Sequence, residues 1–249
     1  MNNFTFSGIL FILLALLANG QIDNNDDLAL QILRKVDENL TPESFESYRK
    51  LINEEPDGSK KEFIFFTVKK GQDKMAMLYI SPASERGRAT LRLGDNMWLY
   101  IPNVGRPIRI TSMQSVVGGV FNNSDIMRLD YSVEYDPLIM EENQHEYILD
   151  LKAKTRTVAY DKLKMWVEKN NTMVTKVECY AASGKLIKTL EFKEIKNFGD
   201  GIMRPAVIET SSPLYKGYRS VMIYSGMKAR NLPDEVFTFE FLPRLEELR

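Results

Sequence analysis

The sequence predicts a mainly β protein of the α+β class, in which a curved antiparallel sheet forms an incomplete, half-open β-barrel with an N-terminal helix and a helical or loop lid. Turn signals rich in Gly, Asn and Asp recur along the chain and separate short runs of alternating apolar and polar residues, the pattern of an antiparallel meander. Only one substantial stretch has helical spacing. A twisted sheet of about ten or more strands tends to curl. We therefore expect the sheet to wrap around that single helix.

The chain begins with an apolar run from Phe4 to Leu17, followed by the small residues Ala18-Asn19-Gly20. This pattern predicts a cleaved signal peptide in residues 1–20 and a single domain in residues 21–249. An uncleaved N-terminal anchor is the alternative, because no Lys or Arg precedes the apolar run. That run is shorter than the roughly 20 residues that a spanning helix needs.

The helix is predicted over residues 26–38. Two acidic residues stand at its start, where the helix dipole favours negative charge. Its apolar positions recur at helical spacing and predict one buried face. They are Leu28, Ile32, Leu33 and Val36.

The first strands are predicted to form a hairpin, with residues 46–55 and 60–70 joined at Asp57-Gly58. Asp-Gly supplies the positive φ that a tight turn requires. Similar turn signals separate the later strands. These are predicted at residues 75–80, 89–93, 97–101, 215–225 and 236–242, with four more strands around the turns at residues 170–171, 183–184 and 199–201.

Large apolar side chains on these strands are candidates for the wall of an interior cavity, where Met and aromatic residues give adaptable contacts. Simple core filling is the alternative. A shift of one residue in the inward face would exchange the whole set for its neighbours. The predicted wall residues are Phe63, Phe65, Met75, Met77, Leu91, Leu93, Trp98, Tyr100 and Trp166.

The alternating pattern breaks between Ile110 and His145, where apolar residues mix with flexible glycines before a helix-like stretch at residues 125–129. Long segments without regular structure are uncommon in compact domains and are often functional. We interpret this one as a lid, with a packed surface crossover as the alternative. The lid residues are Val116, Val117, Gly118, Gly119 and Phe121.

Composition excludes several classes of function. The formal net charge is −1 with dispersed Lys and Arg, which does not favour a nucleic-acid partner. Cys179 is the only cysteine and His145 the only histidine, so we expect no metal site and no cofactor. The chain has no Gly-x-Ser-x-Gly elbow and no phosphate-binding glycine loop. We therefore predict no catalytic residues and a protein that is not an enzyme.

The chain resembles the outer-membrane lipoprotein-sorting proteins of the LolA-like group from about Leu28 to its C-terminus. This resemblance implies a half-open β-barrel in the bacterial periplasm, whose concavity holds the acyl chains of a lipoprotein or another lipid. The motifs that carry it are, in order, Asp57-Gly58-Ser59, Gly94-Asp-Asn-Met-Trp-Leu-Tyr-Ile-Pro, Gly105-Arg-Pro-Ile-Arg-Ile, Gly118-Gly119, Asn123-Ser124-Asp125, Lys164-Met-Trp-Val-Glu, Ser183-Gly184-Lys185 and Arg204-Pro205.

The resulting hypothesis is a monomeric periplasmic carrier that binds acyl chains and helps to move them to the outer membrane. Each buried methylene contributes about 0.8 kcal/mol, so release would need an inner-membrane permease, and an outer-membrane acceptor is a further expected partner. Four arginines near turns are candidate contacts for a head group or for such a partner. They are Arg86, Arg88, Arg106 and Arg109.

Two other functions stay open. One is a docking subunit of an ABC or RND-type envelope export system, which the absence of an interior cavity above about 300 Å³ would favour. The other is an envelope hydrolase, which would need His145 or paired carboxylates in one cleft.

Overall fold

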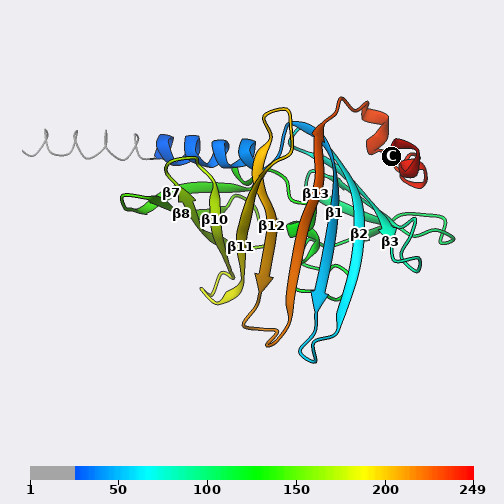
Figure 1. Ribbon diagram of the computed structural model, residues 1–249, viewed down its shortest axis with the longest axis horizontal. Helices are drawn as coiled ribbons and strands as arrows, with labels where there is room; N and C mark the ends of the chain where they lie inside the picture. The colour runs from blue at the N-terminus through cyan, green and yellow to red at the C-terminus, as the bar shows by residue number, and fades with distance from the viewer. Residues whose placement is uncertain (1–25) are drawn as a thin grey trace, which may run out of the picture.

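Thirteen antiparallel strands form one continuous, unclosed sheet in the computed structural model, which describes residues 26–249 (Figure 1). The predicted signal peptide lies outside the described residues. The strand order is β6-β5-β4-β3-β2-β1-β13-β12-β11-β10-β9-β8-β7, so every neighbouring pair is consecutive in the chain except β1 and β13. The predicted fold class, a curved antiparallel sheet with few helices, is confirmed.

The strands in chain order are β1 (Ser44–Glu54), β2 (Lys60–Lys70), β3 (Lys74–Ser81), β4 (Ala89–Leu93), β5 (Asn96–Tyr100), β6 (Ile108–Ile110), β7 (Tyr135–Glu142), β8 (Glu146–Ala153), β9 (Lys162–Glu168), β10 (Val174–Tyr180), β11 (Leu186–Asn197), β12 (Met203–Ser211) and β13 (Arg219–Ala229). Two short helices, α2 (Asn123–Ile126) and α3 (Tyr131–Glu134), lie between β6 and β7. Two 3-10 helices, η1 (Asp234–Phe237) and η2 (Leu242–Leu248), follow β13.

The predicted first hairpin is present as β1 and β2. Gly58 adopts φ +83°, a conformation that glycine accepts without steric cost. The backbone N–H of Ser59 donates a 2.9 Å hydrogen bond to the Asp57 carboxylate and so fixes the turn. The Asp-Gly signal therefore identified both the position and the chemistry of this turn.

The N-terminal helix covers residues 26–40, two residues beyond its predicted end. Ile32, Leu33 and Val36 are buried as predicted, whereas Leu28 is 40% exposed. In Figure 1 the helix (blue) lies across one end of the sheet beside β10 and β11. The Asn39 side chain anchors the helix end by donating hydrogen bonds of 3.1 and 3.0 Å to the carbonyl oxygens of Asn171 and Thr172.

The prediction of a strand at residues 236–242 is wrong. This segment contributes to η1 and η2 instead. Because β13 already pairs with β1 on one side and β12 on the other, its edges are occupied and no further strand can join it. In Figure 1 this C-terminal segment (red) lies at the β3 side of the sheet.

The sheet separates two hydrophobic cores. The inner face carries the first core, where the helix of residues 26–40 and the segment between β6 and β7 pack against strands from the whole sheet. The outer face of β2–β4 carries the second core, which the C-terminal segment covers. The second core consists of Phe66, Val68, Ala76, Leu78, Ile80, Ala89, Leu91, Leu232, Val236, Phe237, Phe241, Leu242 and Leu245.

Candidate functional site

A chain segment of residues 111–134, here called the plug, packs on the inner face of the sheet. Val116, Phe121, Ile126 and Met127 are buried in the first core. The plug begins with a narrow turn, in which the N–H of Val116 donates a 3.0 Å hydrogen bond to the carbonyl oxygen of Phe121. It then continues through α2, which lies two residues earlier than the predicted helix at residues 125–129, and α3.

The tip of the plug approaches the sheet closely. Val117 and Gly118 both have positive φ, at +48° and +78°. A Cβ on Gly119 would lie 2.1 Å from the Asn53 side-chain oxygen, so only glycine fits there without movement of Asn53. The glycines that predicted a flexible lid thus serve a tight turn and a close backbone approach.

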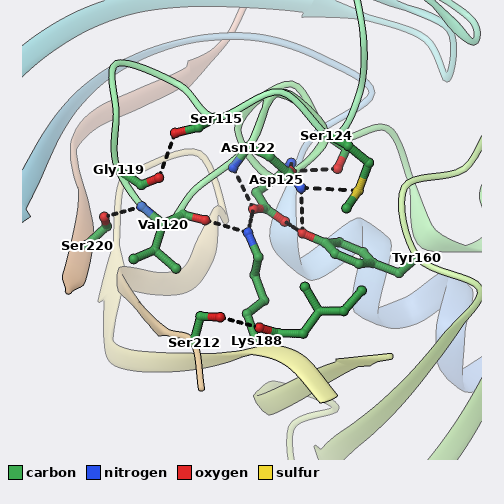
Figure 2. Close-up of polar contacts among 12 residues, drawn as sticks. Ser115, Gly119, Val120, Asn122, Ser124, Asp125, Tyr160, Lys188, Ser212 and Ser220 are labelled. Atoms are coloured by element: carbon green, nitrogen blue, oxygen red, sulfur yellow. Dashed lines mark hydrogen bonds and ion pairs between the residues drawn. The ribbon is translucent and has the colours of Figure 1, made fainter. Parts of the chain in front are cut away.

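Lys188 of β11 is the central anchor of the plug (Figure 2). Its Nζ donates to the carbonyl oxygen of Val120 at 2.5 Å and forms a 2.8 Å ion pair with Asp125. The Tyr160 hydroxyl donates to the other Asp125 oxygen at 2.9 Å. Burial, with the Asp125 charge beside it, raises the pKa of Tyr160 well above its ordinary value. This cluster joins the plug to β11 and to the loop before β9.

A second contact holds the same turn to the other side of the sheet. The N–H of Val120 donates a 2.9 Å hydrogen bond to the Ser220 hydroxyl of β13 (Figure 2). That hydroxyl donates to the Asn53 side chain of β1 at 2.7 Å. The plug therefore bridges β11, β13 and β1.

The rest of the plug is held by charged side chains from β1, β2 and β4. Arg49 donates to the carbonyl oxygen of Ile126 at 2.7 Å, and Arg92 donates to that of Met127 at 2.9 Å. Arg92 also forms an ion pair with Glu134 in α3. Lys69 pairs with Asp130. The anchors of the plug are thus mainly hydrogen bonds to backbone carbonyls and a few ion pairs.

A cluster of cations lies beneath the plug around Tyr224 of β13. The Arg204 guanidinium stacks on the Tyr224 ring at 3.7 Å from its centroid, and that of Arg49 lies at 5.5 Å. Burial opposes ionisation of the phenol, but the charges of Arg204, Arg49 and Arg128 outweigh it and lower the pKa of Tyr224 to about 7. Burial lowers the pKa of Arg49 and Arg204.

Asp37 connects the N-terminal helix to the plug. Its two carboxylate oxygens accept hydrogen bonds of 2.7 and 2.9 Å from the N–H groups of Tyr131 and Ser132, at the start of α3. Burial raises the pKa of Asp37 to about 6. The helix and the plug are therefore linked on the inner face.

The plug leaves little space over β9–β11 in this conformation. The cavity between the plug and β9–β11 has a volume of about 20 Å³, room for a single water molecule. Tyr131, Tyr160 and Cys179 are among its lining residues. Burial raises the pKa of Cys179 well above its usual range, as expected for a thiol in the core.

The structure divides the predicted wall residues between the two faces. Phe63, Phe65, Met75 and Met77 point inward into the first core. The inward orientation predicted for β4 and β5 is wrong by one residue. Thr90, Arg92 and Met97 are the buried inner-face residues there. The residues that pack in or against the second core instead are Leu91, Leu93, Trp98 and Tyr100.

Trp166, also a predicted wall residue, alternates with the buried Met165 and Val167 of β9 and is partly exposed. Its ring lies between two lysines, with Lys164 Nζ at 5.2 Å and Lys176 Nζ at 3.6 Å from the centroid. The outer face of β9 and β10 carries these charges. The inward orientation predicted for Trp166 is therefore wrong.

The four predicted contact arginines lie on or beside loops, outside the first core. Arg88 pairs with Glu85, and Arg86 donates to the carbonyl oxygen of Ile80 at 3.1 Å. Arg106 and Arg109 are exposed around β6. His145 is exposed at the turn before β8.

The inner-face charged residues were missed by sequence reasoning. Arg49, Lys69, Arg92, Lys188 and Arg204 are all buried. Each stands in phase with inward-facing residues of its own strand, as Arg49 does between Ser47 and Leu51. A cation in the inward phase of a strand was the signal that could have found them.

Two further observations concern the described part of the chain. No helix within residues 26–249 is long and apolar enough to cross a membrane. The same residues contain no group of three or more His, Cys, Asp or Glu side chains placed to hold a metal ion.

The unclosed curved sheet, with a helix and a connecting segment on its inner face, is a LolA-like fold. A LolA superfamily protein from Nitrosomonas europaea is 35% identical, with 86% of this chain and 98% of that chain covered and a TM-score of 0.79. The chain belongs to the LolA superfamily. A family model described as an uncharacterized protein also matches residues 71–244.

Two more distant structures share the fold. A DUF1329 family protein from Desulfovibrio piger is 23% identical, with 88% of this chain and 99% of that chain covered and a TM-score of 0.77. A putative outer membrane lipoprotein-sorting protein domain from Vibrio parahaemolyticus is 19% identical, with 88% and 100% covered and a TM-score of 0.76. No curated protein sequence matches the chain.

Proposed function

We propose that this protein is a non-enzymatic periplasmic carrier that takes up acyl chains of a lipoprotein or lipid on the inner face of its sheet when the plug moves aside. The observation that carries this proposal is how the plug is held. Its anchors are individual side chains that hydrogen bond to its backbone carbonyls, such as Lys188 at Val120 and Arg49 at Ile126.

Movement of the plug would uncover an apolar surface of suitable chemistry. Val116 and Phe121 leave the first core when the plug leaves, and Phe63, Phe65 and Met77 of the sheet belong to the same core. Each methylene of an acyl chain buried there contributes about 0.8 kcal/mol. The acyl chain would thus replace the apolar contacts of the plug.

Membership of the LolA superfamily supports a carrier role in general. The finer parts of the proposal are the periplasmic location, an inner-membrane permease that loads the carrier and an outer-membrane acceptor. Arg86, Arg88, Arg106 and Arg109 lie on or beside loops outside the core and are proposed as contacts for those partners.

The first test is to look for bound cargo. Protein expressed from the full chain in a bacterial host would be purified without detergent, measured by native mass spectrometry and extracted with organic solvent. A stoichiometric lipid or acylated peptide is expected. A protein that carries no lipid and takes up none on addition would contradict the carrier function.

The second test locks the plug. Because Val120 N and Ser220 Oγ are 2.9 Å apart, bond lengths keep the two Cα atoms within about 7 Å, close to disulfide range. Val120→Cys with Ser220→Cys, in a Cys179→Ala background, should bind added lipid when reduced and none when oxidised. Cys179→Ala alone is the control and should bind lipid in both conditions. Equal binding by the oxidised and reduced pair would show that the plug does not move for uptake.

A second candidate function is a docking subunit of an envelope export system. The small cavities beside the plug, of about 20 Å³ over β9–β11 and about 280 Å³ next to Asp37, favour it. Such a subunit would keep its plug closed, so it would carry no lipid and the locked variant would retain full function in the cell.

A further inference from the structure

The buried cations of the inner face fall into two groups. Lys69, Arg92 and Lys188 each have a carboxylate partner, in Asp130, Glu134 and Asp125. Arg49 and Arg204 form no ion pair within the part of the chain that the structure describes, and Arg128 beside them, from the plug, is only partly buried. One half of the inner face is therefore electrically balanced, and the other half carries positive charge without a matching carboxylate.

The unbalanced group also has unused hydrogen-bond donors. Nε and Nη2 of Arg49 and Nη2 of Arg204 are buried without a partner among the described residues. The donors that are used reach only neutral carbonyls, of Ile126 for Arg49 and of Leu40 and Pro205 for Arg204. Burying a charge without a counter-charge is costly, so these guanidinium groups are incompletely satisfied when the plug is closed.

Tyr224 is the group of negative charge that acts on both buried arginines. Its ring lies against Arg204 at 3.7 Å. With a pKa of about 7, the phenol supplies at most one negative charge for Arg49 and Arg204 together. The cluster therefore still has an excess of positive charge when Tyr224 is ionised.

The position of the cluster connects it to uptake. Arg49 and Arg204 project from β1 and β12, which are fixed parts of the sheet, and Arg128 belongs to the plug. The carbonyl oxygen that Arg49 binds at 2.7 Å also belongs to the plug, at Ile126. When the plug moves, Arg49 loses this acceptor, and an oxygen of a ligand can take its place.

We propose that Arg49 and Arg204 bind an anionic phosphate or carboxylate head group on the acylated cargo. Guanidinium groups bind such oxyanions through charge-assisted and bidentate hydrogen bonds. This inference rests on the proposed carrier function and assigns the chemical class of its cargo. An anionic head group would replace the Ile126 carbonyl, engage the unused N–H groups and supply the missing charge.

The test compares three probes with the protein expressed from the full chain: dodecyl phosphate, the uncharged 1-O-dodecyl glycerol and inorganic phosphate. Calorimetry should show dodecyl phosphate binding at least about tenfold more tightly than the glycerol ether, a difference of about 1.4 kcal/mol. Equal affinity for the two lipids would overturn the anion site and leave the carrier function intact. Binding of neither lipid would overturn the carrier function itself. Inorganic phosphate bound as tightly as dodecyl phosphate would overturn the assignment to a lipid head group.

Arg49→Gln separates recognition from folding. The substitution removes a cation of the cluster and a tether of the plug. Dodecyl phosphate should therefore bind about tenfold more weakly, whereas the glycerol ether should bind at least as well as before. Equal weakening of both ligands would indicate a purely structural role for Arg49. Arg244→Gln, at an exposed position of η2, is the matched control and should change neither affinity.

A measurement on the unaltered protein avoids the risk of misfolding. An anion beside the arginines offsets their charge, so dodecyl phosphate should raise the pKa of Tyr224 and reduce phenolate absorbance at neutral pH. The glycerol ether should reduce this absorbance less. Tight binding of dodecyl phosphate with the same absorbance change as the glycerol ether would place the head group elsewhere and overturn the proposal.

Discussion

The two cores of this protein differ in what holds them together. The second core, between the outer face of β2–β4 and the C-terminal segment, is built from apolar side chains. The first core, on the inner face, places large apolar residues beside buried cations and the backbone carbonyls of the plug. Apolar packing is non-directional, whereas hydrogen bonds to a carbonyl can be exchanged for those to another acceptor. Under the proposed function, the outer core is permanent and the plug of the inner core is replaceable.

The largest expected change in stability comes from a substitution in the second core. Phe237→Ala removes a buried ring under the C-terminal segment and should lower the free energy of unfolding by about 4 kcal/mol. Lipid bound per folded molecule should not change. Denaturant unfolding and lipid extraction measure the two quantities. Phe239→Ala is the control, because that ring is 43% exposed, and it should cost much less. A loss of lipid binding in folded Phe237→Ala would break the distinction between the cores.

The next largest change in stability should be confined to the inner core and comes from loss of the Lys188 cation. Lys188→Met leaves Asp125 without its cation and frees the carbonyl of Val120. Breaking a buried pair in this way costs about 3 kcal/mol. Hydrogen exchange should therefore accelerate in the plug and stay slow in β2 and β3. Lys193→Met, at an exposed lysine of the same strand, should leave exchange in the plug unchanged. Uniform acceleration across the sheet would argue against a separable plug.

A smaller change in stability is expected from a substitution at the tip of the plug. Gly119→Ala places a methyl group against Asn53, whose side chain must then shift away from Ser220. Crowding of this size costs about 2 kcal/mol. Because the closed form is strained, added lipid should bind more tightly in a titration. Gly226→Ala in β13 meets no atom within 4 Å and is the matched control. Unchanged lipid affinity in Gly119→Ala would mean that this contact does not hold the plug closed.

At neutral pH the smallest effect on stability comes from the ionisation of Tyr224. The pKa of Tyr224 is lowered from 10.0 to about 7, so the unfolded chain binds more protons between these values and stability should rise with pH across this window. The contribution is lost as pH falls through about 7. Phenolate absorbance should show a transition near pH 7 that is absent in Tyr224→Phe. Its absence from the unaltered protein would mean that the arginines do not act on this phenol.

Local sequence signals predicted the architecture well. Asp57-Gly58 identified a hairpin turn. The alternation of Leu163, Met165 and Val167 identified the buried face of β9, because the other face of that strand is partly exposed to solvent. Such signals depend only on neighbouring residues. The unclosed sheet and the N-terminal helix follow from them together.

The alternation of apolar and polar residues did not identify the inward face of strands whose two faces are both covered. In β4 and β5 the apolar residues Leu91 and Trp98 face the C-terminal segment, and the polar Arg92 faces inward to Glu134 of α3. Neither partner is near these strands in sequence, so alternation could not tell the two faces apart. The arginine cluster was beyond reach for the same reason, because Arg49 and Arg204 come together only through the pairing of distant strands.

That pairing also constrains how the chain reaches its native state. β1 and β13 are the first and last strands in sequence, yet they lie side by side in the sheet, and Glu54 and Arg219 are 165 residues apart. Contacts between distant segments form slowly, since long loops must close first. The pairing of β1 with β13 cannot be completed until residue 229 has been synthesised. A chain that emerges from a ribosome or a membrane channel therefore completes its fold only after nearly all of it has passed through.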